Sequence, residues 1–166
     1  QLLENWGGSP NTIFRSTNGF HYLPNALFLV LESRYFYRNG KNIKERKQRL
    51  RYLVNLGANI NAKNSHGRTL LHVAIDVSSD DNAELIRFLL NLGAKRYIRN
   101  TEGLAPIDIA IERKNWKKKR LAEKISQKGK YEPHIYESHI KKLRSEVKEY
   151  ESIINVLARH RKNRRY

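Results

Sequence analysis

The chain has 166 residues, contains no cysteine and carries a formal net charge of +17. The lack of cysteine excludes a disulfide framework and any thiolate site. No stretch approaches the ~18 consecutive apolar residues of a membrane-spanning helix, so we expect a protein that is not membrane-integral. Because the chain starts at Gln1 and contains no methionine, we expect its natural N-terminus to lie upstream.

The positive charge is unevenly distributed along the chain. Residues 113–166 carry 18 basic and 6 acidic side chains, whereas residues 61–112 carry 6 basic and 7 acidic ones. A basic flank of this kind attracts phosphates, acidic proteins or anionic lipid head groups through its long-range field. The alternative explanation is a solvated surface in a protein rich in lysine and asparagine.

The N-terminal part is predicted to have an extension over residues 1–17 and a helical unit over residues 18–62. We expect one helix through Leu27–Tyr37, a turn at Asn39-Gly40, and a second helix over roughly Ile43–Asn55. The second helix runs into the phrase Asn55-Leu56-Gly57-Ala58, which recurs 36 residues later as Asn91-Leu92-Gly93-Ala94. Self-similarity at this period is typical of a stacked repeat.

The central unit, residues 63–98, has the clearest pattern. Gly67 suits a turn with positive φ, and Thr69 can cap a helix start through its hydroxyl group. A short helix follows, with one face formed by Leu71, Ala74 and Ile75. After the polar break at Ser78–Asn82, a second helix ends at Gly93, and its apolar stripe consists of Leu85, Ile86, Leu89 and Leu90.

This unit resembles an ankyrin repeat. The family pattern is Gly-x-Thr-Pro-Leu-His-x-Ala and later Leu-Leu-x-x-Gly-Ala, and it is matched at Gly67, Thr69, Leu71, His72, Ala74, Leu89, Leu90, Gly93 and Ala94. Leu70 replaces the usual proline, and the residues beyond the usual period of ~33 fit in the polar break. The resemblance implies an all-α, ankyrin-type helix-turn-helix solenoid of about three units plus a long C-terminal helix.

The two flanking units match the pattern less closely. Residues 18–62 align their Gly, Leu and Ala with it and carry an insertion of about 15 residues relative to the usual period. Residues 99–128 keep the glycine, proline and alanine, but Ala105 and Asp108 replace the threonine and histidine. We expect this last unit to continue in a following helix through Trp116, Leu121 and Ile125.

The resemblance implies that the chain binds another protein on the surface made by the projecting turns and inner helices. Stacked repeats form long concave surfaces without a single deep pocket. The candidate contact residues in the turns are Asn64, His66, Arg68, Arg99, Asn100 and Glu102. Their alternative role is structural, because asparagine, serine and glycine are common turn residues. His72 could titrate or bind a metal, but the resemblance implies a structural hydrogen bond.

A long helix is predicted from about Glu132 within the C-terminal segment, residues 129–166. Its apolar residues have the spacing of a heptad seam, namely Tyr136, Ile140, Leu143, Val147, Tyr150, Ile154 and Leu157. In one interpretation, which we prefer, the helix folds back and caps the last repeat. In the other it projects and forms a coiled coil with a partner or with a second copy, giving a homodimer.

Basic clusters near the C-terminus form a candidate patch of Lys117, Lys118, Lys119, Arg120, Arg159, Arg161, Lys162, Arg164 and Arg165. Such clusters neutralise phosphates and release counterions, and they can act as nuclear-localisation signals. No groove-reading motif accompanies them, so nucleic-acid binding would be electrostatic and weakly sequence-specific. An acidic protein partner is our preferred hypothesis; electrostatic binding to nucleic acid or another anionic surface is the alternative.

The sequence contains no GxGxxG fingerprint, P-loop or GxSxG motif, and its histidines lack metal-ligand spacing. We therefore expect no catalytic residues, no cofactor and no metal, and we expect a cytoplasmic or nuclear protein. Divergent ankyrin proteins rich in lysine and asparagine are familiar from intracellular bacteria and large DNA viruses. This resemblance in style implies an effector that engages host proteins, in the host cell after delivery.

Overall fold

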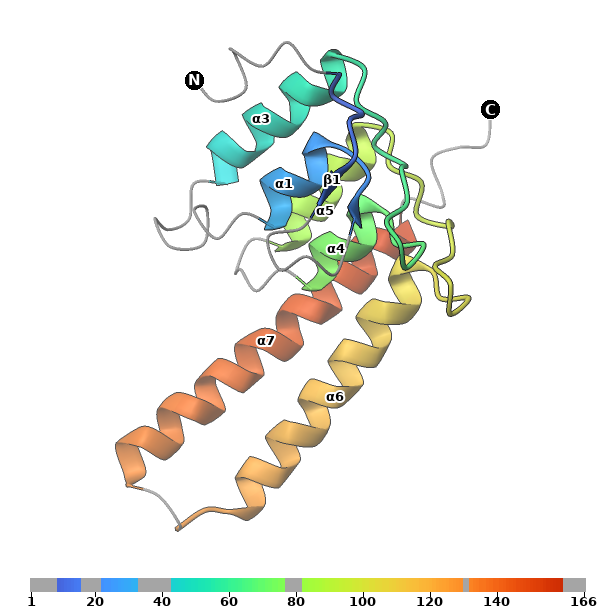
Figure 1. The fold of residues 1–166 in the computed structure, drawn as a ribbon. Helices are drawn as coiled ribbons and strands as arrows, with labels where there is room; N and C mark the ends of the chain where they lie inside the picture. Colours follow the sequence, from blue (N-terminus) through green and yellow to red (C-terminus); the bar gives the residue numbers. More distant parts are fainter. Residues whose placement is uncertain (1–8, 16–21, 33–42, 77–81, 130–131, 160–166) are drawn as a thin grey trace.

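The computed structural model describes residues 9–15, 22–32, 43–76, 82–129 and 132–159. These residues form an all-α helical repeat solenoid that ends in a long helical hairpin (Figure 1). The helices are α1 (Ala26–Glu32), α3 (Ile43–Asn55), α4 (Leu70–Asp76), α5 (Asn82–Asn91), α6 (Pro106–Ser126) and α7 (Pro133–Arg159). Two short strands, β1 (Phe14–Arg15) and β2 (Tyr22–Leu23), pair antiparallel with Phe14 opposite Leu23.

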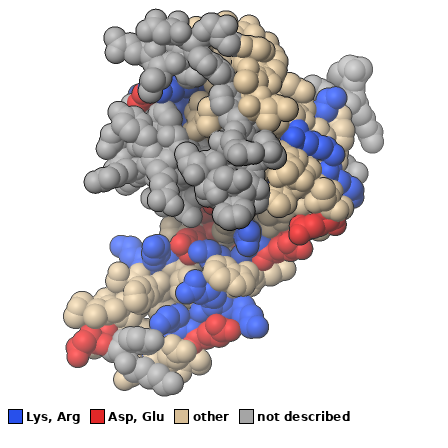
Figure 2. All heavy atoms as spheres, in the orientation of Figure 1, with Lys and Arg blue, Asp and Glu red and all other residues tan. Residues whose placement is uncertain are grey.

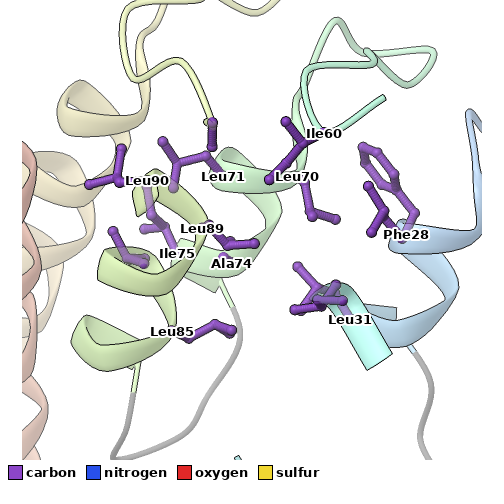
Figure 3. Packing of buried hydrophobic residues seen from close by; sticks show 14 of the residues in the cluster. Phe28, Leu31, Ile60, Leu70, Leu71, Ala74, Ile75, Leu85, Leu89 and Leu90 are labelled. Carbon is purple, nitrogen blue, oxygen red and sulfur yellow. The ribbon is translucent and has the colours of Figure 1, made fainter. Parts of the chain in front are cut away.

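The repeat helices are arranged in two layers with the hydrophobic core between them. α1 packs against α3 and α4 against α5, while α1 also contacts α4 and α3 contacts α5. Leucine, isoleucine and phenylalanine side chains from all four helices meet in this core (Figure 3). The largest fully buried ones are Leu27, Phe28, Leu31, Leu50, Leu53, Leu70, Leu71, Ile75, Leu85, Ile86 and Leu89. Full burial of each such side chain contributes about 1.5–3 kcal/mol, so the core stabilises the stack.

The helices of the first two units lie where the sequence pattern places them. α3 covers the predicted range Ile43–Asn55, and α4 and α5 form the predicted pair of the central unit. α1 begins at Ala26. The predicted continuation of its helix and the predicted turn at Asn39-Gly40 lie in residues 33–42, outside the described residues. Gly57 and Gly93 follow α3 and α5 with φ values of +92° and +97°, the left-handed conformation that commonly ends helices.

The last unit differs from the prediction, because one continuous helix replaces the expected succession of two. α6 begins at Pro106, in the first helical position that suits proline, and Asp108 Oδ2 accepts a 2.9 Å hydrogen bond from the Ala105 amide. It then runs without a break through Trp116 to Ser126. Lysine, arginine, glutamate, alanine and leucine dominate this stretch and favour a helix. Since no glycine, proline or polar turn interrupts it, the helix does not reverse until Gly129.

α7 runs back along α6 and forms the antiparallel partner that the last unit lacks (Figure 1). Its first half packs on the far half of α6, so these parts of the two helices project from the repeat body. Its second half reaches the repeats, where it packs on α5. Ile153 and Leu157 are almost completely buried there and belong to the same hydrophobic core as the repeat helices.

Polar contacts also join α7 to the repeat body. Glu149 Oε1 accepts a 2.8 Å hydrogen bond from the Ala83 amide, one of the N–H groups that have no partner within the first turn of α5. Arg96 Nη1 donates to the Leu157 carbonyl oxygen at 3.1 Å. Lys117 of α6 forms a 2.6 Å ion pair with Glu146 of α7. The second half of α7 thus forms the terminal layer of the stack.

Candidate protein-interaction surface

Two asparagines build the projecting turns between the repeats. Asn64 Oδ1 accepts 3.0 Å hydrogen bonds from the amides of His66 and Arg68. Asn100 Oδ1 accepts equivalent bonds from the amides of Glu102 and Leu104, at 3.0 and 2.9 Å. The side chains of Asn64 and Asn100 therefore hold the turns in shape, which is the structural role predicted as the alternative to direct partner contact.

The two turns are also bonded to each other. The backbone amide and the hydroxyl group of Thr101 both donate to the His66 carbonyl oxygen, at 3.1 and 3.0 Å. Gly67 lies at this contact with φ of +65°, and a Cβ atom added to it would lie 2.9 Å from the Thr101 amide nitrogen. Glycine at position 67 thus allows both the turn conformation and the close stacking of the turns.

A second pair of asparagines connects the end of one unit to the next. Asn61 Nδ2 donates to the Gly93 carbonyl oxygen at 3.2 Å, and its Oδ1 accepts from the Lys95 amide at 2.7 Å. Asn11 makes the same two bonds one unit earlier. Its Nδ2 donates to the Gly57 carbonyl oxygen at 2.9 Å, and its Oδ1 accepts from the Asn59 amide at 2.8 Å. The residue 36 positions after Asn61 is Tyr97, which cannot form this amide bridge. The sequence pattern did not reveal these links because asparagine is common throughout the chain.

His72 connects the central unit to the last one. Its Nδ1 accepts a 3.1 Å hydrogen bond from the Thr69 amide, which can only donate. Its Nε2 lies 3.1 Å from the Leu104 carbonyl oxygen, which can only accept. These partners define a neutral imidazole with its proton on Nε2. Burial lowers the pKa of His72, an effect partly offset by the Leu104 bond and reinforced by Arg68.

We expect acid to destabilise the fold through His72. The unfolded imidazole binds a proton below a pKa of about 6.5, while the folded one binds it only at lower pH. Stability is therefore full above pH ~6.5 and falls as the pH drops from there through the lowered folded pKa. Urea unfolding at about pH 7.5 and 5.5 should show this loss, of at most about 1.4 kcal/mol per pH unit. An unchanged slope in a folded His72→Asn variant would contradict this assignment.

Residues 53–110, from the end of α3 into the first turn of α6, match a family model described as ankyrin repeats (many copies). The match contains the complete central unit and both stacked turns. Residues 53–110 of the chain are ankyrin repeats. No curated protein matches it. Ankyrin repeats are non-catalytic interaction scaffolds, and this chain therefore carries a protein–protein interaction module.

Within the described part of this ankyrin protein, no helix is long and apolar enough to cross a membrane. The same residues contain no group of three or more histidine, aspartate or glutamate side chains placed to hold a metal ion.

Arg68 is engaged inside the ankyrin stack. It forms an ion pair with Asp76 at the end of α4 and donates to the His72 carbonyl oxygen at 3.1 Å. Asp76 also accepts a 2.8 Å bond from Arg113 Nε of α6. One carboxylate thus joins a turn, α4 and α6. Sequence reasoning missed Asp76, because its two arginine partners lie 8 and 37 residues away.

The exposed side of the turns is basic and carries one aromatic side chain. Lys95, Tyr97 and Arg99 alternate with less exposed residues, and Tyr97 and the Arg99 side chain are 69% and 65% exposed. Lys63 lies beside them and donates to the Arg99 carbonyl oxygen at 3.0 Å. We call Lys63, Lys95, Tyr97 and Arg99 the turn-edge surface. The predicted contact residues His66 and Glu102 are exposed at the tips of the same turns.

Some residues of the predicted basic patch form ion pairs within the protein, and others are exposed to solvent. Lys117 and Lys118 form ion pairs with Glu146 and Glu151 of α7, at 2.6 and 3.4 Å. Lys119, Arg120 and Arg159 are exposed, and Figure 2 shows basic side chains gathered over the hairpin. The remaining residues of the patch, Arg161, Lys162, Arg164 and Arg165, lie outside the described residues.

The predicted heptad seam lies along the inner side of α7. Tyr136, Ile140, Leu143, Val147 and Leu157 are buried, and Tyr150 and Ile154 are half-buried. The helices that they face are α6 and α5 of the same chain. This arrangement corresponds to the capping interpretation of the C-terminal helix, since the seam is covered within the chain.

Proposed function

We propose that this ankyrin scaffold, acting without catalysis, binds an acidic protein partner on its turn-edge surface. The observation that carries the proposal is the exposed row of Lys95, Tyr97 and Arg99. Tyrosine and arginine are enriched among the residues that dominate binding energy at interfaces, and basic side chains on a rim steer and select acidic partners. The contacts that the exposed His66 and Glu102 would add are part of the same proposal.

The ion pair between Arg99 and Asp108 leaves Arg99 able to bind a partner. Arg99 Nη1 donates to the Gly103 carbonyl oxygen at 2.5 Å and lies 3.4 Å from Asp108 Oδ2. The side chains of Arg99 and Asp108 are 65% and 38% exposed, and ion pairs at the surface contribute only about 0–1 kcal/mol. A carboxylate of a partner can therefore take the place of Asp108 at little cost. Asn64 and Asn100 would support the surface by shaping its turns, and Arg68 by anchoring its turn to Asp76.

The richness in lysine and asparagine, which resembles that of ankyrin proteins from intracellular bacteria and large DNA viruses, supports an effector that acts on host proteins in the cytoplasm or nucleus. Affinity capture from a host-cell lysate, followed by mass spectrometry and measurement with the purified partner, tests the proposed surface. Lys95→Glu with Arg99→Glu should weaken the partner's binding at least about tenfold, since interface hot spots contribute 2 kcal/mol or more. Lys141→Glu with Lys148→Glu makes the same charge change on exposed positions of α7 and should leave binding unchanged. Equal retention by both double variants would show that the turn-edge surface is the wrong one.

A second candidate function is electrostatic binding of nucleic acid or another anionic surface by the basic patch. The excess of 18 basic over 6 acidic side chains in residues 113–166 favours it. Titration of DNA and RNA against ionic strength decides the question, because phosphate neutralisation gives a linear dependence of log affinity on log salt. Absence of binding at low salt, or binding without this dependence, would reject the second candidate.

A further inference from the structure

The projecting hairpin carries a basic and aromatic face that is separate from the turn-edge surface. On α6, Arg113, Trp116 and Arg120 are three and four residues apart, so they lie on one side of the helix. Lys117, four residues after Arg113, borders this side, and its ion pair with Glu146 joins α6 to α7. We call the side of the hairpin that carries this pair the Trp116 face.

The same ion pair identifies the residues of α7 that belong to the Trp116 face. Counting back from Glu146 by four, three and four residues gives Lys142, His139 and Ile135 on one side of α7. The pair of Lys117 with Glu146 brings this row beside the α6 row, because the helices run antiparallel. Two rows of exposed side chains thus flank the line where α6 and α7 meet.

The Trp116 face combines exposed apolar area with positive charge. Trp116 is 50% exposed and Ile135 is 41% exposed. The guanidinium carbon of Arg120 lies 4.9 Å from the centre of the Trp116 ring, and Lys117 Nζ lies 5.3 Å from it. Among the described residues, Arg120 and Lys142 have no carboxylate partner. Between Arg113 and Arg120 on α6 and between Ile135 and Glu146 on α7, the only acid in the two rows is Glu146, which is paired with Lys117. The same spacing places Glu123 and Glu132 beyond the far ends of the rows.

We propose that the Trp116 face binds an acidic amphipathic helix of a protein partner. A third helix can pack along the line between two antiparallel helices in the manner of a helical bundle. Its apolar side would cover Trp116 and Ile135, and its carboxylates would pair with Arg120 and Lys142. This combination favours a protein helix over nucleic acid, because phosphates would gain nothing from covering Ile135.

This surface is distinct from the turn-edge surface. Trp116 is ten residues into α6, about 15 Å from its first residue at 1.5 Å per residue. Arg120 and Lys142 lie still further along the projecting half. The proposal therefore stands or falls independently of the turn-edge proposal, and each has its own charge-reversal variants.

The test uses the full chain with Trp6→Phe, which leaves Trp116 as its only tryptophan, so its fluorescence reports directly on the face. The probe is a synthetic helical peptide of about 20 residues, long enough at 1.5 Å per residue to cover the projecting half, with a leucine stripe bordered by glutamates. A scrambled peptide of the same composition and a single-stranded oligonucleotide serve as competing probes. Arg120→Glu with Lys142→Glu alters the face, and Lys141→Glu with Lys148→Glu is the control with the same net charge.

We expect saturable binding of the amphipathic peptide with a shift of the Trp116 emission. Arg120→Glu with Lys142→Glu should weaken it at least about tenfold, whereas the control and Lys95→Glu with Arg99→Glu should leave it unchanged. The proposal fails if the peptide does not bind, if the scrambled peptide binds equally well, or if the control variant loses as much affinity. Tighter binding of the oligonucleotide with the same dependence on Arg120 and Lys142 would assign the face to nucleic acid instead.

Discussion

Replacing Ile153 with alanine is expected to lower the free energy of unfolding by about 2–5 kcal/mol. Ile153 is 0% exposed and packs in the same core as Leu85, Ile86 and Leu89. Removing its branched side chain leaves a cavity between α7 and the repeats, which adds to the lost transfer free energy. Urea unfolding followed by circular dichroism measures the change.

The matched control is Ile111→Ala on α6. Ile111 is 38% exposed, and alanine is the better helix former, so the free energy of unfolding should change by no more than about 0.5 kcal/mol. If both isoleucine variants lose the same small amount of stability, α7 does not belong to the core of the ankyrin stack.

Replacing Gly67 with alanine should be the second most damaging change. An L-residue at positive φ costs roughly 1–2 kcal/mol, and the new Cβ atom would approach the Thr101 amide to 2.9 Å. Overpacking of this kind costs about 1–3 kcal/mol more. The collision also pushes the two projecting turns apart, so the bonds between Thr101 and His66 should lengthen or break.

Gly103→Ala separates the two contributions. Gly103 has φ of +77° and nothing within 4 Å of an added Cβ atom, so it carries only the conformational cost of about 1–2 kcal/mol. The difference between the two alanine variants in urea unfolding gives the free energy of turn stacking. Equal losses would mean that the two turns are not in close contact.

The central ankyrin unit could be predicted from local pattern because its physical causes are local. Gly67, the apolar stripe of α5 and the ending at Gly93 each need only a few neighbouring residues. α6 could not be predicted in the same way. The family pattern led us to expect two helices in the last unit, but the favourable helix propensity of residues 111–125 outweighs it when a partner helix, α7, covers one side.

Roles that depend on contacts between units were harder to predict. His72 has the structural bond that the family resemblance implied, to a carbonyl 32 residues away. In contrast, the place of Arg68 in a projecting turn predicts a contact residue, and only the fold brings it to Asp76, which also binds Arg113. Tyr97 occupies the position at which Asn61 forms its bridge one unit earlier, and no short motif reveals that this bridge is lost.

In this structure α7 forms the terminal layer of the ankyrin stack. The most direct test is amide hydrogen exchange of α5 and of the second half of α7, in the wild-type protein and in Ile153→Ala. The structure predicts that both segments are protected together in the wild type, including the Ala83 amide that bonds to Glu149, and that both lose protection in the variant. Rapid exchange of α7 beside a protected α5, unchanged in Ile153→Ala, would contradict it.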